Sequence, residues 1–227
     1  MNTLGIIGGI APESTIDYYR QLVAAYRARV TDGSYPNLII NSIDLKGMID
    51  LIAAKELEAV TVMLTNELAR LARAGAEVGL FASNTPHLVF DELQRRSPLP
   101  LISIVEETCR VASAANMKRV GLFGTRFTMD NDFYPRAFAR AGIEVVVPSP
   151  DDRQLIHDKY FAELVPGVFR DETRAEMLAI AARLPSIDGL VLGGTELPLL
   201  LRGDSANGIP LLDTTRIHVA AAMRELA

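Results

Sequence analysis

The sequence contains one cysteine, no tryptophan and three histidines in 227 residues. A single thiol, Cys109, excludes an intrachain disulfide and a thiolate metal cluster, and such cysteine usage is typical of a reducing compartment. No run of Lys and Arg occurs in the chain, and the formal net charge of -5 is unlike that of a protein that binds a polyanion. We therefore expect no nucleic-acid partner and no metal site.

Long apolar runs are also missing. No stretch approaches the roughly 18 apolar residues of a membrane span, and residues 1–10 lack the basic region that begins a secretory signal. We expect a cytoplasmic protein without membrane contact. Hydrophobic residues are nevertheless abundant, at 49% of the sequence, which is enough for sheets that are covered by helices on both faces.

Three segments of the first half of the chain are echoed in the second half, in the same order. They are residues 4–9 with 120–125, residues 79–87 with 189–198, and residues 98–103 with 208–213. Each is an apolar run followed or ended by small or polar residues, which is typical of a buried parallel strand whose carboxyl end lies where α/β sheets place ligands. The repeat predicts an α/β fold of two similar doubly wound parallel-sheet lobes, related by pseudo-twofold symmetry, with an active-site cleft between them.

The same repeat predicts where the chain passes between the lobes. The crossings are expected near Pro98–Leu101 and Gly208–Leu211, so that residues 1–98 plus 211–227 form the first lobe and residues 99–210 the second. The last helix, from about Thr215, then returns to the first lobe.

Apolar spacing predicts strands and helices in alternation. The expected strands include residues 4–7, 38–42 and 80–82, and the expected helices cover residues 14–29, 55–73, 128–140, 153–165, 171–183 and 215 onward. Ser14 is expected to cap the first helix and Gly75 to end the second. Buried stripes are expected at Ile16, Leu22, Val23 and Tyr26 in the first helix and at Leu57, Val60, Leu64, Leu68 and Leu71 in the second.

Several segments of the chain resemble the aspartate/glutamate racemase family. They are residues 5–15 (GIIGGIAPEST), 83–87 (SNTPH), 193–196 (GGTE) and 213–218 (DTTRIH), and residues 41–44 and 124–129 resemble the subgroup with broad-specificity and L-aspartate/glutamate racemases. The resemblance covers the whole chain. It implies proton transfer at the α-carbon of an amino acid without a cofactor, one acid/base residue on each lobe, and a homodimer.

In most members of that family the two acid/base residues are cysteines, and the positions that match them here are Ser83 and Gly194. A serine hydroxyl is far less acidic than a thiol, so Ser83 needs an adjacent base, for which His87 is the nearest candidate in sequence. Gly194 has no side chain, and Thr195, Glu196 or a water molecule would have to take its role. The expected catalytic positions are therefore Ser83, Gly194 and Thr195.

The resemblance also implies a set of substrate-binding positions. They are Ile10, Asp44, Asn84, Thr85, Thr125, Arg126, Phe127, Thr195 and Glu196. The position that matches the family's lysine is Val165, which leaves Lys46 and Arg126 as basic candidates. Backbone N–H groups of Asn84, Thr85 and Thr195 at strand-to-helix turns can also hold a carboxylate. The expected partner is thus an amino acid or a related carboxylate.

Structural roles remain open for most of these residues. Gly8 and Gly9 form a turn without the full G-x-G-x-x-G spacing of a dinucleotide site. Ser83 and Thr85 can simply cap the following helix, and Glu196 can be a solvated or capping carboxylate. His87 and His218 are expected to support neighbouring groups rather than act as bases, and Cys109 is expected in the core.

Three functions remain compatible with the sequence. The first is an amino-acid racemase, impaired or adapted at Ser83 and Gly194. The second is a lyase, decarboxylase or isomerase with one base, since only one face of a planar carbanion then needs a proton donor. The third is a catalytically inactive protein that binds a ligand, or an engineered variant without its cysteines.

Overall fold

The computed structural model describes residues 2–226, which form two compact units. The first unit extends to Ser103 and resumes at His218, and the second covers Ile104–Ile217. Both boundaries lie later in the chain than the predicted ones, after residues 98 and 210. The reason is strand pairing: the segment around Leu101 joins the sheet of the first unit, and Leu211–Asp213 pairs within the sheet of the second.

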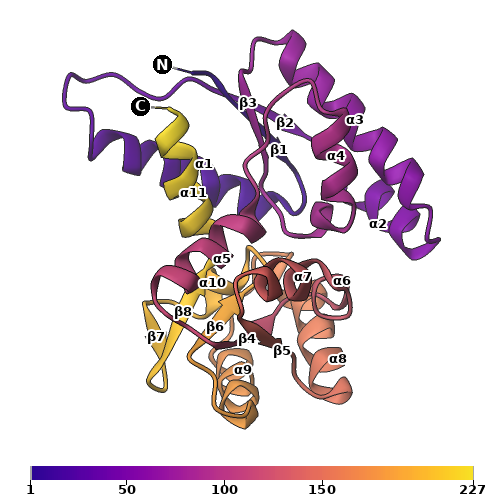
Figure 1. The fold of residues 1–227 in the computed structure, drawn as a ribbon, viewed down its shortest axis with the longest axis vertical. Helices are drawn as coiled ribbons and strands as arrows, with labels where there is room; N and C mark the ends of the chain where they lie inside the picture. Colours follow the sequence, from indigo (N-terminus) through magenta and orange to yellow (C-terminus); the bar gives the residue numbers. More distant parts are fainter. Residues whose placement is uncertain (1, 227) are drawn as a thin grey trace. The chain divides into compact units, whose positions relative to one another are not determined.

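The first unit alternates strands and helices, as Figure 1 shows in indigo to magenta, with the last helix in yellow. Its elements are β1 (Leu4–Gly8), α1 (Pro12–Arg27), β2 (Leu38–Ser42), α2 (Leu45–Ala53), α3 (Leu57–Arg73), β3 (Val78–Phe81), the 3-10 helix η1 (Thr85–Val89), α4 (Phe90–Arg96) and most of α11 (Thr214–Glu225). The sequence predicts one helix over residues 55–73, and α2 precedes it as an additional helix.

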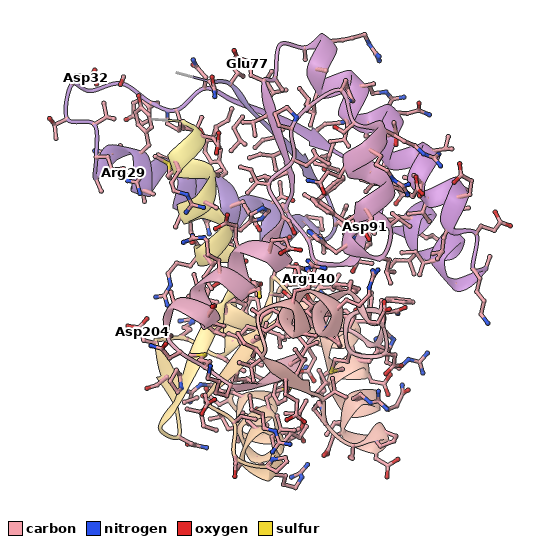
Figure 2. The ribbon with its side chains drawn as sticks, viewed as in Figure 1. Arg29, Asp32, Glu77, Asp91, Arg140 and Asp204 are labelled. Atoms are coloured by element: carbon pink, nitrogen blue, oxygen red, sulfur yellow. The ribbon has the colours of Figure 1, made fainter. Side chains whose placement is uncertain are left out.

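The sheet of the first unit is parallel, in the order β2-β1-β3. Helices α1 and α11 lie on one face of it, and α3 and α4 lie on the other (Figure 1). The core on the α1 side joins residues from both ends of the chain: Leu4, Ile6, Tyr18, Leu22, Tyr26, Val78, Leu80, Ala82, Val219, Ala222, Met223 and Leu226. Arg29, which is labelled in Figure 2, donates to the Met223 carbonyl at 3.0 Å and so ties the end of α1 to α11.

Two residues that were expected on buried stripes are exposed. Ile16 is 42% exposed because the buried positions of α1 recur every four residues, and a residue two places before Tyr18 lies on the opposite face. Leu57 is also 42% exposed, since it is the first residue of α3 and the buried face begins at Val60. The other predicted positions of the α3 stripe are buried, and Gly75 has a φ of +100° directly after the helix.

The second unit repeats the strand arrangement. Its elements are α5 (Ile104–Ala114), β4 (Arg119–Phe123), α6 (Arg126–Met129), α7 (Phe133–Arg140), β5 (Glu144–Val146), α8 (Pro150–Lys159), the π-helical turn η2 (Tyr160–Leu164), α9 (Asp171–Arg183), β6 (Gly189–Leu192), α10 (Leu197–Leu200), β7 (Ser205–Ala206) and β8 (Ile209–Asp213). The strand order is β5-β4-β6-β8-β7, with only β7 antiparallel.

Equivalent repeat segments occupy equivalent places in the two sheets. β3 pairs with β1 as β6 pairs with β4. The segment around Leu101 then extends the first sheet beside Gly79, with Gly79 N–H donating to Pro100 O and Ile102 N–H to Gly79 O, both at 2.9 Å, as β8 extends the second beside β6. The sequence repeat is therefore a repeat of strand topology.

Cys109 belongs to the core of the second unit, as expected. It lies on α5, is 6% exposed, and its Sγ is 3.6 Å from the Ala137 carbonyl oxygen on α7. Burial raises the pKa of this thiol, and Glu106 adds to the effect. Cys109 is consequently a packing residue and not a reactive thiolate.

Candidate active site

The carboxyl ends of the three strands of the first unit are joined by backbone contacts. Ile43 N–H donates to Gly8 O and Ala82 N–H donates to Ile7 O, both at 2.9 Å. Gly9 has a φ of +82°, and a Cβ there would overlap the Ile43 carbonyl oxygen. Only glycine fits this turn, and the loops after β1, β2 and β3 form one edge of the sheet.

Ser14 fastens this edge to the first helix. Its hydroxyl lies 2.8 Å from Ala11 O and 3.0 Å from Ala82 O, so it links the first turn of α1 to the end of β3. The prediction that Ser14 caps α1 is wrong: Ala11 is the cap residue, Pro12 follows it, and Ser14 lies inside the first turn with its side chain fully buried. Ile10, a predicted substrate contact in the same loop, is 3% exposed.

Ser83, Asn84 and Thr85 follow β3 and are nearly buried, at 5%, 2% and 8% exposure. Within residues 2–226, neither the Ser83 nor the Thr85 hydroxyl has a hydrogen-bond partner. The alternative interpretation, that these hydroxyls cap the following helix, is therefore wrong, because η1 has no side-chain cap. Two hydroxyls at this sheet edge are therefore not engaged by other side chains or by the backbone of the described residues.

His87 is committed to the structure around it. The Asn84 carbonyl oxygen, 3.2 Å from Nδ1, can only accept, so the imidazole carries its proton on Nδ1 and the Ser103 hydroxyl donates to Nε2 at 3.1 Å. The ring also stacks on Phe90 with centroids 4.3 Å apart. Burial, followed by the nearby His218, lowers the pKa of His87 to about 3. His87 is hence a neutral anchor for the Asn84 turn, and the hypothesis that it activates Ser83 is wrong.

His218 is also a structural residue. It is fully buried, its Nε2–H donates to Ile102 O at 3.0 Å, and its Nδ1 lies 2.8 Å from the Tyr18 hydroxyl. Because Nε2 must donate to a carbonyl, Nδ1 accepts the phenolic proton of Tyr18. This pair of bonds fixes α11 to α1 and to the segment that leaves the first unit.

The two remaining polar candidates of the first unit are engaged on its surface. The Asp44 carboxylate caps α2, accepting from Lys46 N at 3.0 Å and Gly47 N at 3.2 Å. The Lys46 ammonium pairs with Asp50 at 2.5 Å, and both side chains are largely exposed. These contacts neither use nor test the predicted roles of Asp44 and Lys46 in ligand binding.

In the second unit, glycines let the loops after β4 and β6 approach each other closely. A Cβ on Gly124 would lie 2.9 Å from Gly193 O, and a Cβ on Gly193 would lie 2.9 Å from Phe123 O. Gly193 N–H donates to Phe123 O at 2.7 Å. This contact brings the predicted site residues that follow β4 next to those that follow β6.

The residues after β4 differ in their surroundings. The hydroxyl of Thr125 is buried and has no hydrogen-bond partner within the described residues 2–226. Arg126 donates through its backbone N–H to His157 Nδ1 at 3.2 Å and through its guanidinium to Gln154 Oε1 at 2.8 Å. The rings of Phe127 and His157 are nearly perpendicular, with centroids 5.9 Å apart. Arg126 and Phe127 are thus held against α8, and Arg126 has no acidic partner in the part of the chain that the structure describes.

Gly194 lies against an aromatic ring that the sequence analysis did not single out. A Cβ on Gly194 would be 2.5 Å from Tyr160 Cε2, 2.9 Å from the Tyr160 hydroxyl oxygen and 3.0 Å from Cζ. These distances are too short for any side chain at residue 194 beside the present position of the ring. The phenol of Tyr160 therefore occupies the space that a side chain at residue 194 would need.

Tyr160 forms a hydrogen-bonded group with two of the predicted site residues. Its hydroxyl donates to Glu196 Oε2 in a short hydrogen bond, and the Thr195 hydroxyl donates to the same oxygen at 3.2 Å. Tyr160, Thr195 and Glu196 are 6%, 2% and 1% exposed. Burial raises the pKa of Tyr160 well above its usual value, and the Glu196 carboxylate adds to the rise, so the phenol keeps its proton at neutral pH.

Tyr160 is the main site candidate that sequence reasoning missed. A glycine at the position of an expected side chain signals that another group fills the space, but the spacing of residues 160 and 194 does not reveal which one. Glu196, for which a solvated carboxylate was an open interpretation, is buried instead.

The structure also bears on membrane and metal binding. Among residues 2–226, no helix has both the length and the apolar character that a bilayer span requires. In the same range, no three His, Cys, Asp or Glu side chains are grouped so that they could hold a metal ion.

A family pattern and a curated protein that match this chain both carry the name of a racemase. The pattern of the family described as Asp/Glu/Hydantoin racemase matches residues 7–222. The broad-specificity amino-acid racemase RacX of Bacillus subtilis is 28% identical over 151 residues, which cover 63% of each chain. The match thus spans somewhat less than two thirds of that curated relative.

Solved structures match over the full length. A candidate Asp/Glu racemase from Yersinia pestis superposes with a TM-score of 0.88 at 32% identity, covering 100% of this chain and 99% of that one. An aspartate racemase homologue from Pyrococcus horikoshii OT3 superposes with a TM-score of 0.82 at 34% identity, with the same coverage. This chain belongs to the Asp/Glu/Hydantoin racemase family.

Proposed function

We propose that this protein catalyses proton transfer at the α-carbon of an amino acid or a closely related carboxylate, without a cofactor. The observation that carries the proposal is a set of hydroxyls without partners among the described residues, at sheet edges of a chain that belongs to a racemase family. They are the hydroxyls of the buried residues Ser83 and Thr85 in the first unit and the buried hydroxyl of Thr125 in the second. Such groups are stabilised by a polar ligand that accepts their hydrogen bonds. Aspartate and glutamate are the first substrates to test, since they are named for several relatives.

The groups that we propose for substrate binding include hydrogen-bond donors at the strand ends of each unit. Backbone N–H groups of Asn84, Thr85 and Thr195 would hold a carboxylate, because N–H groups at such turns favour anions. Arg126 would supply positive charge, since no acidic side chain within residues 2–226 neutralises it. Ile10, Asp44, Phe127 and Glu196 complete the proposed set from the loops of the same strand ends and the helices that begin there.

A second candidate function is supported by the asymmetry of the proton-transferring groups. His87 does not activate Ser83, and Gly194 has no side chain. A lyase, decarboxylase or isomerase needs a proton donor on only one face of the carbanion, so a single competent group suffices. One-base chemistry in the same fold therefore needs a substitute for only one of the two missing cysteines.

One experiment tests both candidates. The protein is incubated in deuterated water with a panel of L- and D-amino acids, and loss of the α-proton is followed by NMR together with chiral chromatography. Racemisation places deuterium on both enantiomers, whereas one-base chemistry labels one enantiomer or releases a product of different mass. The absence of exchange and of product across the panel would refute α-carbon proton transfer, and isothermal calorimetry with the same panel would then identify a binding protein.

Two further properties belong to the proposal. We infer a homodimer from the family resemblance and a cytoplasmic location from the single cysteine, which suits a reducing compartment. Light scattering after size-exclusion chromatography measures the first, and a monomeric mass at micromolar concentration would contradict it. Fractionation of the source cells measures the second.

A further inference from the structure

The Tyr160 phenol fills the space of the side chain expected at residue 194, and its position suggests that it also takes over the function of that side chain. The phenolic oxygen lies 2.9 Å from the point where residue 194 would carry its Cβ, so a hydroxyl lies beside the position that the family resemblance assigns to the second acid/base residue. A residue that served only to fill this space would not need a polar atom there. The hydroxyl is moreover bonded to a buried carboxyl group, that of Glu196.

We propose that the Tyr160 hydroxyl, coupled to Glu196, is the acid/base group that the second unit contributes, in place of a side chain at residue 194. This inference rests on the proposed function, since it names the group that moves the proton. Tyr160 is the catalytic residue in this assignment, because its oxygen exchanges the proton with the α-carbon. Glu196 is the positioning residue and the store of the proton.

The proton transfer balances within the pair. In the direction of abstraction, the α-carbon C–H bond breaks and its proton joins the Tyr160 oxygen, while the phenolic proton moves to Glu196 Oε2. The electron pair of the C–H bond stays on the substrate as a carbanion, and the pair gains one proton. In the direction of protonation, Tyr160 gives its proton to the carbanion and recovers one from the Glu196 carboxyl group, which ends as a carboxylate.

The observed hydrogen bonds place Glu196 where it can exchange a proton with the phenol. Glu196 Oε2 accepts from the Tyr160 hydroxyl and from the Thr195 hydroxyl. The abstraction step described above requires Glu196 to be a carboxylate, which can accept the phenolic proton. The neighbouring Glu196 N–H and Thr195 hydroxyl act to lower the pKa of Tyr160, against the larger effect of burial.

The backbone around Tyr160 gives independent support. Tyr160 begins the π-helical turn η2, directly after α8, and Val165 N–H closes the turn on the Tyr160 carbonyl at 2.9 Å. Single π-helical turns are rare and occur frequently at functional sites, because they displace a side chain from the regular helical path. Here the displaced position is that of the phenol next to Gly194.

The test compares Tyr160→Phe with wild type in the deuterium-exchange assay. The variant keeps the ring and removes only the hydroxyl, so we expect its melting temperature to stay close to that of the control, Tyr134→Phe, a second buried tyrosine of the same unit. The exchange rate should fall by about 100-fold or more, as is typical for removal of a general acid/base. The control should retain wild-type exchange.

Stereochemistry separates a catalytic from a structural role. Because Tyr160 serves one face of the carbanion, Tyr160→Phe should slow exchange of one enantiomer much more than exchange of the other, whereas a packing defect would slow both alike. Glu196→Gln should show the same bias with a smaller loss. Exchange within threefold of wild type for Tyr160→Phe would overturn the inference.

A double variant tests the position itself. Gly194→Cys combined with Tyr160→Ala removes the overlapping ring and introduces a thiol, and exchange should then increase with pH around the ordinary thiol pKa of about 8.5. The wild type should lack this rise. If wild type shows no exchange, the proposed function fails and this inference with it; if wild type shows exchange but Tyr160→Phe is unaffected, only the assignment of Tyr160 fails.

Discussion

Tyr18 and His218 are separated by 200 residues in the chain, yet the Tyr18 hydroxyl lies 2.8 Å from His218 Nδ1 in the core of the first unit. Their rings also meet edge to face at 5.8 Å between centroids. This contact and the bond from His218 Nε2 to Ile102 O fix α11 in place. Both residues are fully buried, so the hydrogen bond has no competition from water.

Tyr18→Phe should destabilise the protein by about 1–3 kcal/mol, because it leaves a buried imidazole nitrogen without its donor. Urea unfolding at neutral pH measures the change. The matched control is Tyr19→Phe on the same helix, where the side chain is 51% exposed and the expected effect is within about 0.5 kcal/mol. Equal effects of the two substitutions would show that the Tyr18 bond does not contribute to stability.

The burial of His87 predicts a dependence of stability on pH. Its pKa is lowered to about 3 in the folded protein, against about 6.5 when unfolded, so the unfolded chain binds more protons as the pH falls below 6.5. The contribution of His87 is complete above pH 6.5 and decreases by about 1.4 kcal/mol per pH unit down to pH 3. NMR titration should show a His87 ring that stays neutral from pH 8 to pH 5.

The comparison variant for this prediction is His87→Gln, which has no imidazole to protonate. Its free energy of unfolding should fall less steeply than that of wild type between pH 6.5 and 4.5, even though its stability at pH 7.5 is lower. A His87 resonance that titrates with a midpoint near 6.5 would contradict the prediction.

Ser14 and Ser83 are both buried serines, but we expect opposite consequences from their replacement. Ser14→Ala removes the link between Ala11 and Ala82 and should cost about 1–2 kcal/mol of stability. Ser83→Ala removes a hydroxyl that has no partner within residues 2–226 and should change stability by less than about 0.5 kcal/mol. Thermal unfolding distinguishes the two.

We expect Ser83→Ala to reduce activity more than Ser14→Ala does, which is the reverse of the order expected for their effects on stability. If Ser83 contacts the substrate, Ser83→Ala lowers α-proton exchange or raises KM by about tenfold, which corresponds to one hydrogen bond to a charged group. An Ser83→Ala protein with unchanged stability and unchanged kinetics would exclude Ser83 from the site.

The overlap of residue 194 with Tyr160 predicts an energetic coupling. Gly194→Ala should destabilise the wild-type protein by about 1–3 kcal/mol through overpacking, and by clearly less when Tyr160 is already alanine. The control is Gly47→Ala in α2, where a Cβ meets only Asp44 Oδ2 at 3.5 Å and helix propensity favours alanine. Additive effects of Gly194→Ala and Tyr160→Ala would contradict the coupling.

Features of the chain that depend on local periodicity could be predicted from the sequence. The strand Leu38–Ser42 and the helix Asp171–Arg183 were expected with the observed bounds, and the repeat correctly identified equivalent strands in the two sheets. The end of α8 was not expected, because a π-helical turn follows from packing and has no characteristic apolar spacing.

For the candidate site, the sequence predicts which strand ends carry the residues but not which partners their side chains contact. The strand ends that hold Ser83, Thr125 and Thr195 follow from the parallel sheets, because such ends always lie at one edge. The partners of individual side chains do not follow from the pattern. His87 bonds to Ser103 and Tyr160 reaches Gly194 because distant segments pack together, and no local rule encodes either contact.

The participation of α11 in the first core has a consequence for synthesis of the protein. Val219, Ala222, Met223 and Leu226 complete a cluster that begins with Leu4 and Ile6, whereas the second unit is continuous in the chain. On the ribosome, the second unit therefore has all its residues before the first unit can close its core. Until α11 has been synthesised, the part of this core that α11 covers stays exposed beside α1, so the first unit is expected to complete its folding after the second.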